Sequence, residues 1–199
     1  MGDAIVLASG SATRRQLFAA AHVPVDAVVP RIDETALRAG LAAEGASPRD
    51  IADALAETKA RKVADKRPDA LVIGCDQVLD FEGAALGKAD TLDDLRVQMV
   101  RLRGKRHALL SAAVIYEAGR PVWRHVGVAR MSMRDVSDTY LDAYLDRNGA
   151  ELLDSVGGYR IEGEGVRLFT RIDGDQFAVL GLPMLEILSY LALRGAIPA

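Results

Sequence analysis

The feature of this sequence that most constrains its fold is a short apolar run that carries a single acid. The run covers residues 71–78, and Asp76 lies near its end. A short apolar stretch bounded by turn residues is typical of a strand buried inside a sheet. We therefore predict a core strand here, with Asp76 at or near the strand end, where open α/β sheets carry catalytic groups.

Helices and a second strand surround this run. Residues 4–8 predict another buried strand, and Ser11 is placed to cap the helix that follows it. The segment S-P-R-D at residues 47–50 predicts the start of a second helix, because it places serine at the N-cap and proline at the first helical position. The polar residues 31–35 are expected to form a loop.

The pattern changes in the second half of the chain. Two long segments, residues 107–116 and 122–133, are separated by the turn-forming run E-A-G-R-P and predict an antiparallel hairpin. Strands and helices alternate without regular βαβ spacing, so the predicted class is α/β or α+β with a mixed, partly antiparallel sheet. The remaining expected elements are a helix at residues 136–147, short strands around 159–161 and 166–172, and a helix after Pro183.

Composition excludes several classes of protein. The 199 residues are enough for one domain or two small lobes, and the net charge of −3 argues against binding nucleic acid by bulk attraction. The single cysteine, Cys75, excludes an intrachain disulfide and a multi-cysteine zinc site. No apolar stretch approaches the roughly 20 residues that span a bilayer, and no secretory leader is expected. The prediction is a cytoplasmic protein without nucleic-acid or membrane partners.

A turn between the first strand and its helix is a candidate phosphate site. Residues 9–15 read S-G-S-A-T-R-R. Backbone N–H groups at a helix N-terminus favour an anion, and Arg14 and Arg15 add charge-assisted donors. An ordinary βα turn with a serine N-cap fits this segment equally well. The segment is neither a Walker loop nor a dinucleotide fingerprint.

Four further side chains are candidates for chemistry on a phosphate. Asp76 could ligate Mg²⁺ or accept a proton from water, or simply bond to local backbone N–H groups. Glu34 could be a second metal-facing carboxylate or a solvated loop acid. Lys59, like Lys62, falls on the apolar side of its predicted helix, where the stem could pack while the ammonium reaches water. Lys88 could neutralise a phosphate oxygen or lie on the surface.

Other chemistry-bearing residues form no catalytic pattern. The three histidines are expected to be structural, and Cys75 is expected to be a buried small residue. The glycine-punctuated residues 157–165 either let a nucleotide base approach the backbone or form a tight hairpin.

Taken together, these segments resemble the Maf family of nucleoside triphosphate pyrophosphatases, from Leu7 to Pro183. The matching motifs occur in the family's order, and the ordered set is more specific than any one of them. They are L-A-S-G-S at 7–11 with R-R at 14–15, K-A at 59–60, G-C-D-Q at 74–77, L-G-K at 86–88, the glycine-rich segment at 158–163, I-D-G-D at 172–175 and V-L-G-L-P at 179–183.

The resemblance implies a single domain over residues 1–199 with a two-lobed α/β fold of the Maf/ITPase-like type. A curved mixed β-sheet flanked by helices would carry a central nucleotide cleft, and the chain would form a homodimer. The implied reaction cleaves the α–β phosphate bond of a nucleotide with Mg²⁺ or Mn²⁺, clearing unwanted nucleotides from the pool. The implied roles are proton acceptor for Asp76, triphosphate binding for Ser9, Arg14, Lys59 and Lys88, and metal binding for Glu34 and Asp76.

The resemblance also indicates a substrate. Gln77 after Asp76, together with Glu162, is similar to the branch that acts on 7-methyl-GTP, in which a carboxylate can accept from the donors on the guanine edge. Thr13 stands where that branch usually has tryptophan, and Ala12 replaces proline, so the base preference is expected to be relaxed or shifted. The alternatives are a dTTP/UTP pyrophosphatase of the same family and a non-catalytic nucleotide-binding regulator of cell division.

Overall fold

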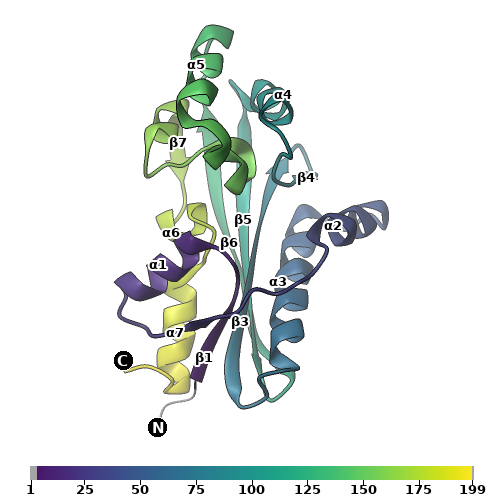
Figure 1. The fold of residues 1–199 in the computed structure, drawn as a ribbon, viewed down its shortest axis with the longest axis vertical. Coiled ribbons are helices and arrows are strands. Elements are labelled where there is room, and N and C mark those ends of the chain that lie inside the picture. The colour runs from purple at the N-terminus through teal and green to yellow at the C-terminus, as the bar shows by residue number, and fades with distance from the viewer. Residues whose placement is uncertain (1–3, 199) are drawn as a thin grey trace.

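The computed structural model describes residues 4–198, and its framework is a seven-stranded mixed sheet (Figure 1). The strand order is β2-β1-β3-β5-β6-β7, and β4 pairs with β3 beside this path. β1 is parallel to β2 and β3, whereas the other pairs are antiparallel, which confirms the predicted mixed sheet. The strands are β1 (Ala4–Ala8), β2 (Asp26–Ala27), β3 (Ala70–Phe81), β4 (Ala84–Leu86), β5 (Arg106–Glu117), β6 (Arg120–Met133) and β7 (Phe169–Asp173).

Serine or threonine side chains cap several of the helices. The side chains of Ser11, Ser47, Thr91 and Ser137 each accept the backbone N–H three residues on, so four of the helix starts carry a side-chain cap from these residues. None of the helices within residues 4–198 is long and apolar enough to cross a membrane. The helices are α1 (Ala12–Ala20), α2 (Glu34–Ala43), α3 (Pro48–Ala64), α4 (Leu92–Leu102), α5 (Asp138–Asn148), α6 (Gln176–Val179) and α7 (Met184–Arg194).

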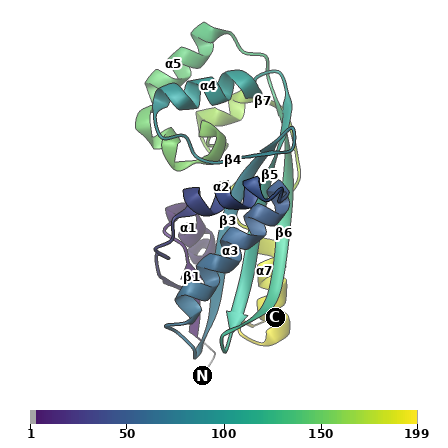
Figure 2. The same cartoon turned by 90° about the vertical axis from the view of Figure 1, so that its right-hand side faces the viewer.

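The helices divide the molecule into two lobes along the long strands. In one lobe α1 and α7 cover one face of the sheet and α3 covers the other (Figures 1 and 2). In the second lobe α4 and α5 pack over the far end of β5 and β6. Each lobe has its own apolar packing, with one cluster around Leu95 and Tyr144 and two clusters on either side of β3. The two-lobed α/β fold is confirmed, although residues 1–3 and 199 of the predicted single domain lie outside the described residues.

The position of Asp76 corrects the sequence prediction. β3 continues to Phe81, so Asp76 lies within the strand, paired with Ala112 of β5, and not at its end. Pairing with β5 extends to Asp80 and pairing with β4 to Phe81, so the segment after Asp76 is held from both sides. Gly74 allows α3 to pack closely against β3, because a Cβ at this position would lie 2.2 Å from the carbonyl oxygen of Ala56 in α3.

Two segments differ from the predicted elements. The expected loop at residues 31–35 ends in a helix start, since Asp33 caps α2 by accepting the backbone N–H of Ala36 at 2.9 Å. The expected strand at residues 159–161 is absent from the described chain, which forms short 3₁₀ turns on both sides of this segment. Gly158 explains the turn, because its φ is +70° and a Cβ would lie 2.3 Å from Leu95 of α4. The glycines therefore let this segment pack against α4, and they form no hairpin.

Burial of His107 is expected to make stability depend on pH. His107 is 5% exposed, its Nε2 lies 2.7 Å from the Tyr159 hydroxyl, and burial lowers its pKa to about 4. The unfolded chain, with an ordinary pKa of about 6.5, binds more protons between these two values. The contribution of His107 to the free energy of unfolding should therefore fall by about 3 kcal/mol as pH falls from 7 to 4.

Urea unfolding at several pH values measures this effect. His107→Gln should flatten the dependence, while His22→Asn, at an exposed turn residue with φ of 54°, should retain it. An unchanged pH dependence in His107→Gln would contradict the assignment.

Candidate functional site

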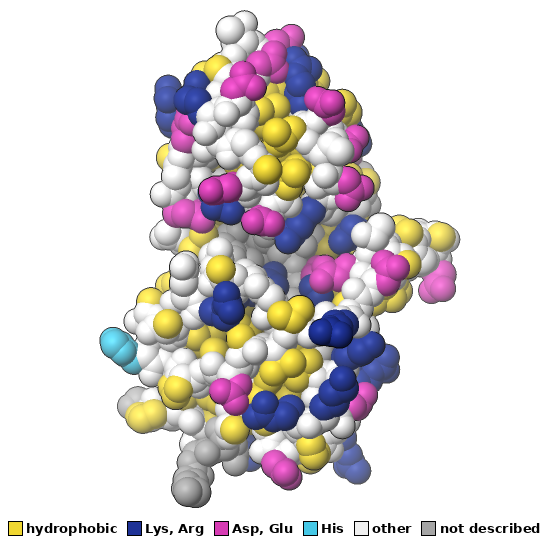
Figure 3. Space-filling model, viewed as in Figure 1, with side chains coloured by type: hydrophobic (Ala, Val, Ile, Leu, Met, Phe, Trp, Pro, Cys, Tyr) yellow, Lys and Arg dark blue, Asp and Glu magenta, His cyan; other side chains and the backbone are white. Residues whose placement is uncertain are grey.

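A cavity of about 1100 Å³ lies between the two lobes. Figure 3 shows the surface hollowed there, with Lys and Arg side chains beside Asp and Glu side chains around the hollow. Segments far apart in sequence line it, which explains why no single motif could define it. They are the β1–α1 turn, the segment from Val29 to Asp33, the start of α2, Lys59 of α3, the middle of β3, residues 88–90, Leu109 of β5, residues 153–156, residues 159–162 and residues 179–181.

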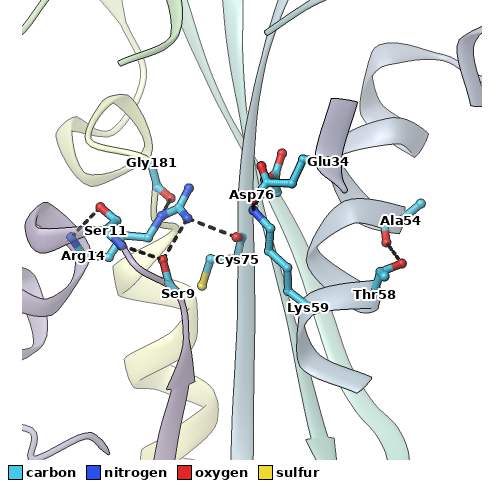
Figure 4. A network of polar contacts seen from close by, with 10 residues as sticks. All are labelled: Ser9, Ser11, Arg14, Glu34, Ala54, Thr58, Lys59, Cys75, Asp76 and Gly181. Carbon is cyan, nitrogen blue, oxygen red and sulfur yellow. Dashed lines mark hydrogen bonds and ion pairs between the residues drawn. The ribbon is translucent and has the colours of Figure 1, made fainter. Parts of the chain in front are cut away.

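Two carboxylates and one lysine form the charged centre of the cavity. The Nζ atom of Lys59 lies 2.5 Å from Oδ1 of Asp76 and 2.8 Å from Oε1 of Glu34. Figure 4 shows all three side chains on the α3 side of β3, with Lys59 reaching up from α3 between the two acids. The Lys59 side chain is 7% exposed and that of Glu34 is 43% exposed. The group therefore extends from the buried strand toward solvent.

Asp76 has the environment of a proton acceptor. It is 4% exposed, and this burial raises the pKa of its carboxyl above the ordinary value. The charges of Lys59 and Arg14 act in the opposite direction and favour the carboxylate. A buried carboxylate with a raised pKa is a better base than a solvated one, provided that nearby cations keep it ionised.

Arg14 approaches β3 from the opposite side (Figure 4). Its Nε donates to the carbonyl oxygen of Gly181 at 2.8 Å, and its Nη1 donates to that of Cys75 at 3.0 Å and to Ser9 Oγ at 3.3 Å. The guanidinium therefore joins the β1–α1 turn, β3 and the segment after α6, while Arg14 and Ser9 also line the cavity. Cys75 itself is fully buried, and burial raises its thiol pKa to about 11, which disfavours a nucleophilic role.

The three positions expected to govern specificity all line the cavity: Thr13, Gln77 and Glu162. The amide nitrogen of Gln77 lies 3.0 Å from each of three acceptors, Ser111 Oγ and the carbonyl oxygens of Ala178 and Val179. Gln77 is therefore held in place by β5 and α6. Ser111 was not singled out from the sequence, because only the pairing of β3 with β5 places it beside Gln77.

Glu162 is free to meet a ligand, in contrast to its neighbour Glu164. Glu164 bonds with Arg147 and Asn148 and lies 3.7 Å from Arg167. Within the described chain, the Glu162 carboxylate makes no hydrogen bond or ion pair. Asp154, on the same wall, lies 3.9 Å from Arg160, so the acid left without a partner there is Glu162.

The cavity also offers an oxygen donor set for a metal. Among residues 4–198 there is no cluster of three or more His, Cys, Asp or Glu side chains placed to hold an ion. Glu34 and Asp76, which share the Lys59 ammonium, each keep a second carboxylate oxygen that makes no hydrogen bond or ion pair within residues 4–198. Mg²⁺ is commonly bound through one or two carboxylates together with substrate phosphates and water, so this pair fits such an ion.

The chain is similar to proteins of known family. Residues 4–193 match the family model described as Maf-like protein. A nucleoside triphosphate pyrophosphatase from Ruegeria pomeroyi is 58% identical over 193 residues, 97% of each chain. A 7-methyl-GTP pyrophosphatase from Mesorhizobium japonicum is 44% identical over 197 residues, 99% of each chain. Among solved structures, a dITP/XTP pyrophosphatase from Mycobacterium abscessus aligns with 98% of this chain and 97% of its own, at 15% identity and a TM-score of 0.44. The family match spans every segment that lines the cavity.

Proposed function

This chain belongs to the Maf-like protein family and is a nucleoside triphosphate pyrophosphatase, and we propose that the nucleotide it cleaves is 7-methyl-GTP or another modified nucleotide. The observation that carries the proposal is the unpaired Glu162 on the cavity wall, beside the paired Glu164. The alternative within the family is a pyrophosphatase acting on dTTP and UTP.

In the proposed reaction a water molecule attacks the α-phosphorus. Asp76 accepts the proton of this water, the bond between the α-phosphorus and the bridging oxygen breaks, and pyrophosphate leaves with that oxygen. Lys59, Lys88 and the N–H groups of the β1–α1 turn, which includes Ser9, offset the negative charge of the phosphates. Arg14 holds this turn against β3 and adds its positive charge to the same wall of the cavity. The reaction gives a nucleoside monophosphate and pyrophosphate.

Glu34 and Asp76 would hold a divalent cation, Mg²⁺ or Mn²⁺. Such an ion neutralises phosphate charge and orients the polyphosphate when it is bound. Lys59 lies between the two acids, so it limits the repulsion between them before substrate arrives.

Glu162 would read the base. The guanine edge presents N1–H and N2–H donors that one carboxylate can accept, and methylation at N7 adds a positive charge to the ring. A pyrimidine offers neither this pair of donors nor this charge. Thr13, at the start of α1, provides no aromatic surface for stacking, so we expect discrimination to rest on the carboxylate more than on stacking.

Substrate discrimination by Glu162 can be measured directly. With Mg²⁺ present, kcat/KM for 7-methyl-GTP should exceed that for GTP, UTP and dTTP. Glu162→Gln should lower kcat/KM for 7-methyl-GTP by about 10–100-fold, because a charge-assisted pair is worth roughly 1.5–3 kcal/mol. Its effect on UTP should be smaller.

The matched control is Glu164→Gln, which removes an acid two residues away that is bound to Arg147. It should leave the order of substrates unchanged. Equal losses for all nucleotides in Glu162→Gln, or a preference of the unmodified enzyme for UTP and dTTP, would favour the alternative substrates.

We further propose that the enzyme forms a single domain over residues 1–199, works in the cytoplasm as a homodimer, and removes modified nucleotides from the pool. Hydrolysis of a triphosphate by the purified protein would distinguish it from a non-catalytic regulator. In cells, Asp76→Asn would mimic a gene deletion if the chemistry matters, whereas a regulator would tolerate the substitution.

A further inference from the structure

Arg38 lies in the cavity although no motif of the sequence includes it. It is on α2, four residues after Glu34, and residues at this spacing lie on the same face of a helix. Both side chains line the cavity. Because Lys59 joins Asp76 to Glu34, the charged groups form a series that begins at Asp76 and reaches Arg38 one helical turn beyond Glu34.

The guanidinium of Arg38 packs directly on Gly87. A Cβ on Gly87 would lie 2.2 Å from Nη1 and 2.6 Å from Cζ of Arg38. Gly87 precedes Lys88 in the loop after β4, and its carbonyl oxygen accepts from Gln98 of α4 at 3.2 Å. Arg38 therefore reaches from the lobe that contains α3 to a loop that the opposite lobe holds.

The donors of Arg38 are unused within the described chain. Its Nε is buried and has no hydrogen-bond partner, and no carboxylate of residues 4–198 forms an ion pair with it. The other arginines of the cavity differ, since Arg14 donates to two backbone carbonyls and Arg160 is bound to Glu151. A planar fork of unused donors beside a lysine is suited to bidentate binding of a phosphate.

We propose that Arg38 binds the pyrophosphate half of the substrate, together with Lys88, and so joins the two lobes across the bound polyphosphate. This inference rests on the proposed function and adds a phosphate ligand to it. The α-phosphorus must lie near Asp76, so the polyphosphate extends past Glu34 toward Arg38 and Lys88. Glu162, on the wall formed by residues 153–162, would then contact the base of the nucleotide.

Binding of the two products separates this role from a structural one. In calorimetric titrations with Mg²⁺, Arg38→Met should weaken binding of inorganic pyrophosphate at least 10-fold and change the affinity for 7-methyl-GMP less than twofold. The KM for the triphosphate should rise by a similar factor. Arg38→Lys should restore part of the affinity, since it keeps the charge and loses the fork. Arg49→Met, at an exposed position of α3, is the matched control and should match the unmodified enzyme.

Gly87→Ala gives an independent test with Arg38 in place. The added Cβ would displace the flexible end of Arg38, so pyrophosphate binding should weaken, and the substitution should have little further effect in Arg38→Met. Unchanged pyrophosphate affinity in Arg38→Met, equal loss of 7-methyl-GMP binding, or additive effects of the two substitutions would overturn the proposal. If the unmodified protein hydrolyses no triphosphate but these pyrophosphate effects are seen, the proposed function fails and the Arg38 site stands.

Discussion

Asp76→Asn should lower kcat by about 10³–10⁴-fold and leave the protein folded. A general base contributes up to about 10⁴-fold, and asparagine cannot take the proton from water. The amide is nearly the same size as the carboxylate, and Glu34 remains 2.8 Å from Lys59 to balance its charge. Release of pyrophosphate from the preferred triphosphate, measured at saturating substrate, gives kcat, and circular dichroism checks the fold.

The matched control lies on the same strand. Asp80→Asn changes an acid four residues further along β3, where Oδ1 accepts the backbone N–H of Gly83 at the turn to β4. Asp80 does not line the cavity, so its substitution should leave kcat within about twofold. Retention of a tenth or more of kcat in Asp76→Asn would show that another group takes the proton.

The same residue shows how far local sequence could define the site. The apolar run predicted a buried strand and gave Asp76 its importance, and both are present in the structure. The strand end was placed at Val78 because turn-forming residues follow closely, among them Asp80 and Gly83. Leu79 and Phe81 resume the apolar pattern, and pairing with β5 through Asp80 continues the strand. Such pairing depends on residues about 30 positions away and leaves no local signal.

Helix periodicity predicted the position of Lys59 correctly but did not distinguish it from Lys62. The pattern placed Lys59 and Lys62 on the apolar side of the helix, yet Lys59 is buried while Lys62 is exposed. What distinguishes them is the close approach of α3 to β3 at Gly74, which brings Lys59 to Asp76. The sequence shows that Gly74 is present, but it does not show which helix or strand packs against this glycine.

Arg38 was missed for a related reason. Residues 31–35 were expected to form a loop, in which a spacing of four residues does not place two side chains together. The structure shows that Glu34 and Arg38 both belong to α2, where this spacing places them on one face. Its contact with Gly87 joins two lobes, and no pattern within either segment indicates it.

Lys59→Met should lower kcat/KM by roughly 10²–10³-fold, a loss typical of removing one electrostatic contact to the transition state. It should also move the acidic limb of the pH profile to higher pH. Activity is lost as pH falls through the pKa of Asp76, which burial raises and the Lys59 charge lowers. Without that charge the pKa rises further, so the base is protonated at a pH where the unmodified enzyme still works.

Three variants separate the charge from the side chain that carries it. Lys59→Arg keeps the charge and should keep the acidic limb near its original pH. Lys62→Met, three residues along α3 at an exposed position, should change neither kcat/KM nor the limb.

Lys59→Met leaves the buried Asp76 without its lysine partner, which should cost roughly 3–5 kcal/mol in the free energy of unfolding. The pH profiles should therefore be recorded well below the melting temperature of this variant. A limb that stays in place in Lys59→Met would mean that Asp76 is not the group titrating in kcat/KM. A limb that moves to lower pH would mean that the ammonium disfavours the active ionisation state, contrary to its contact of 2.5 Å with the carboxylate.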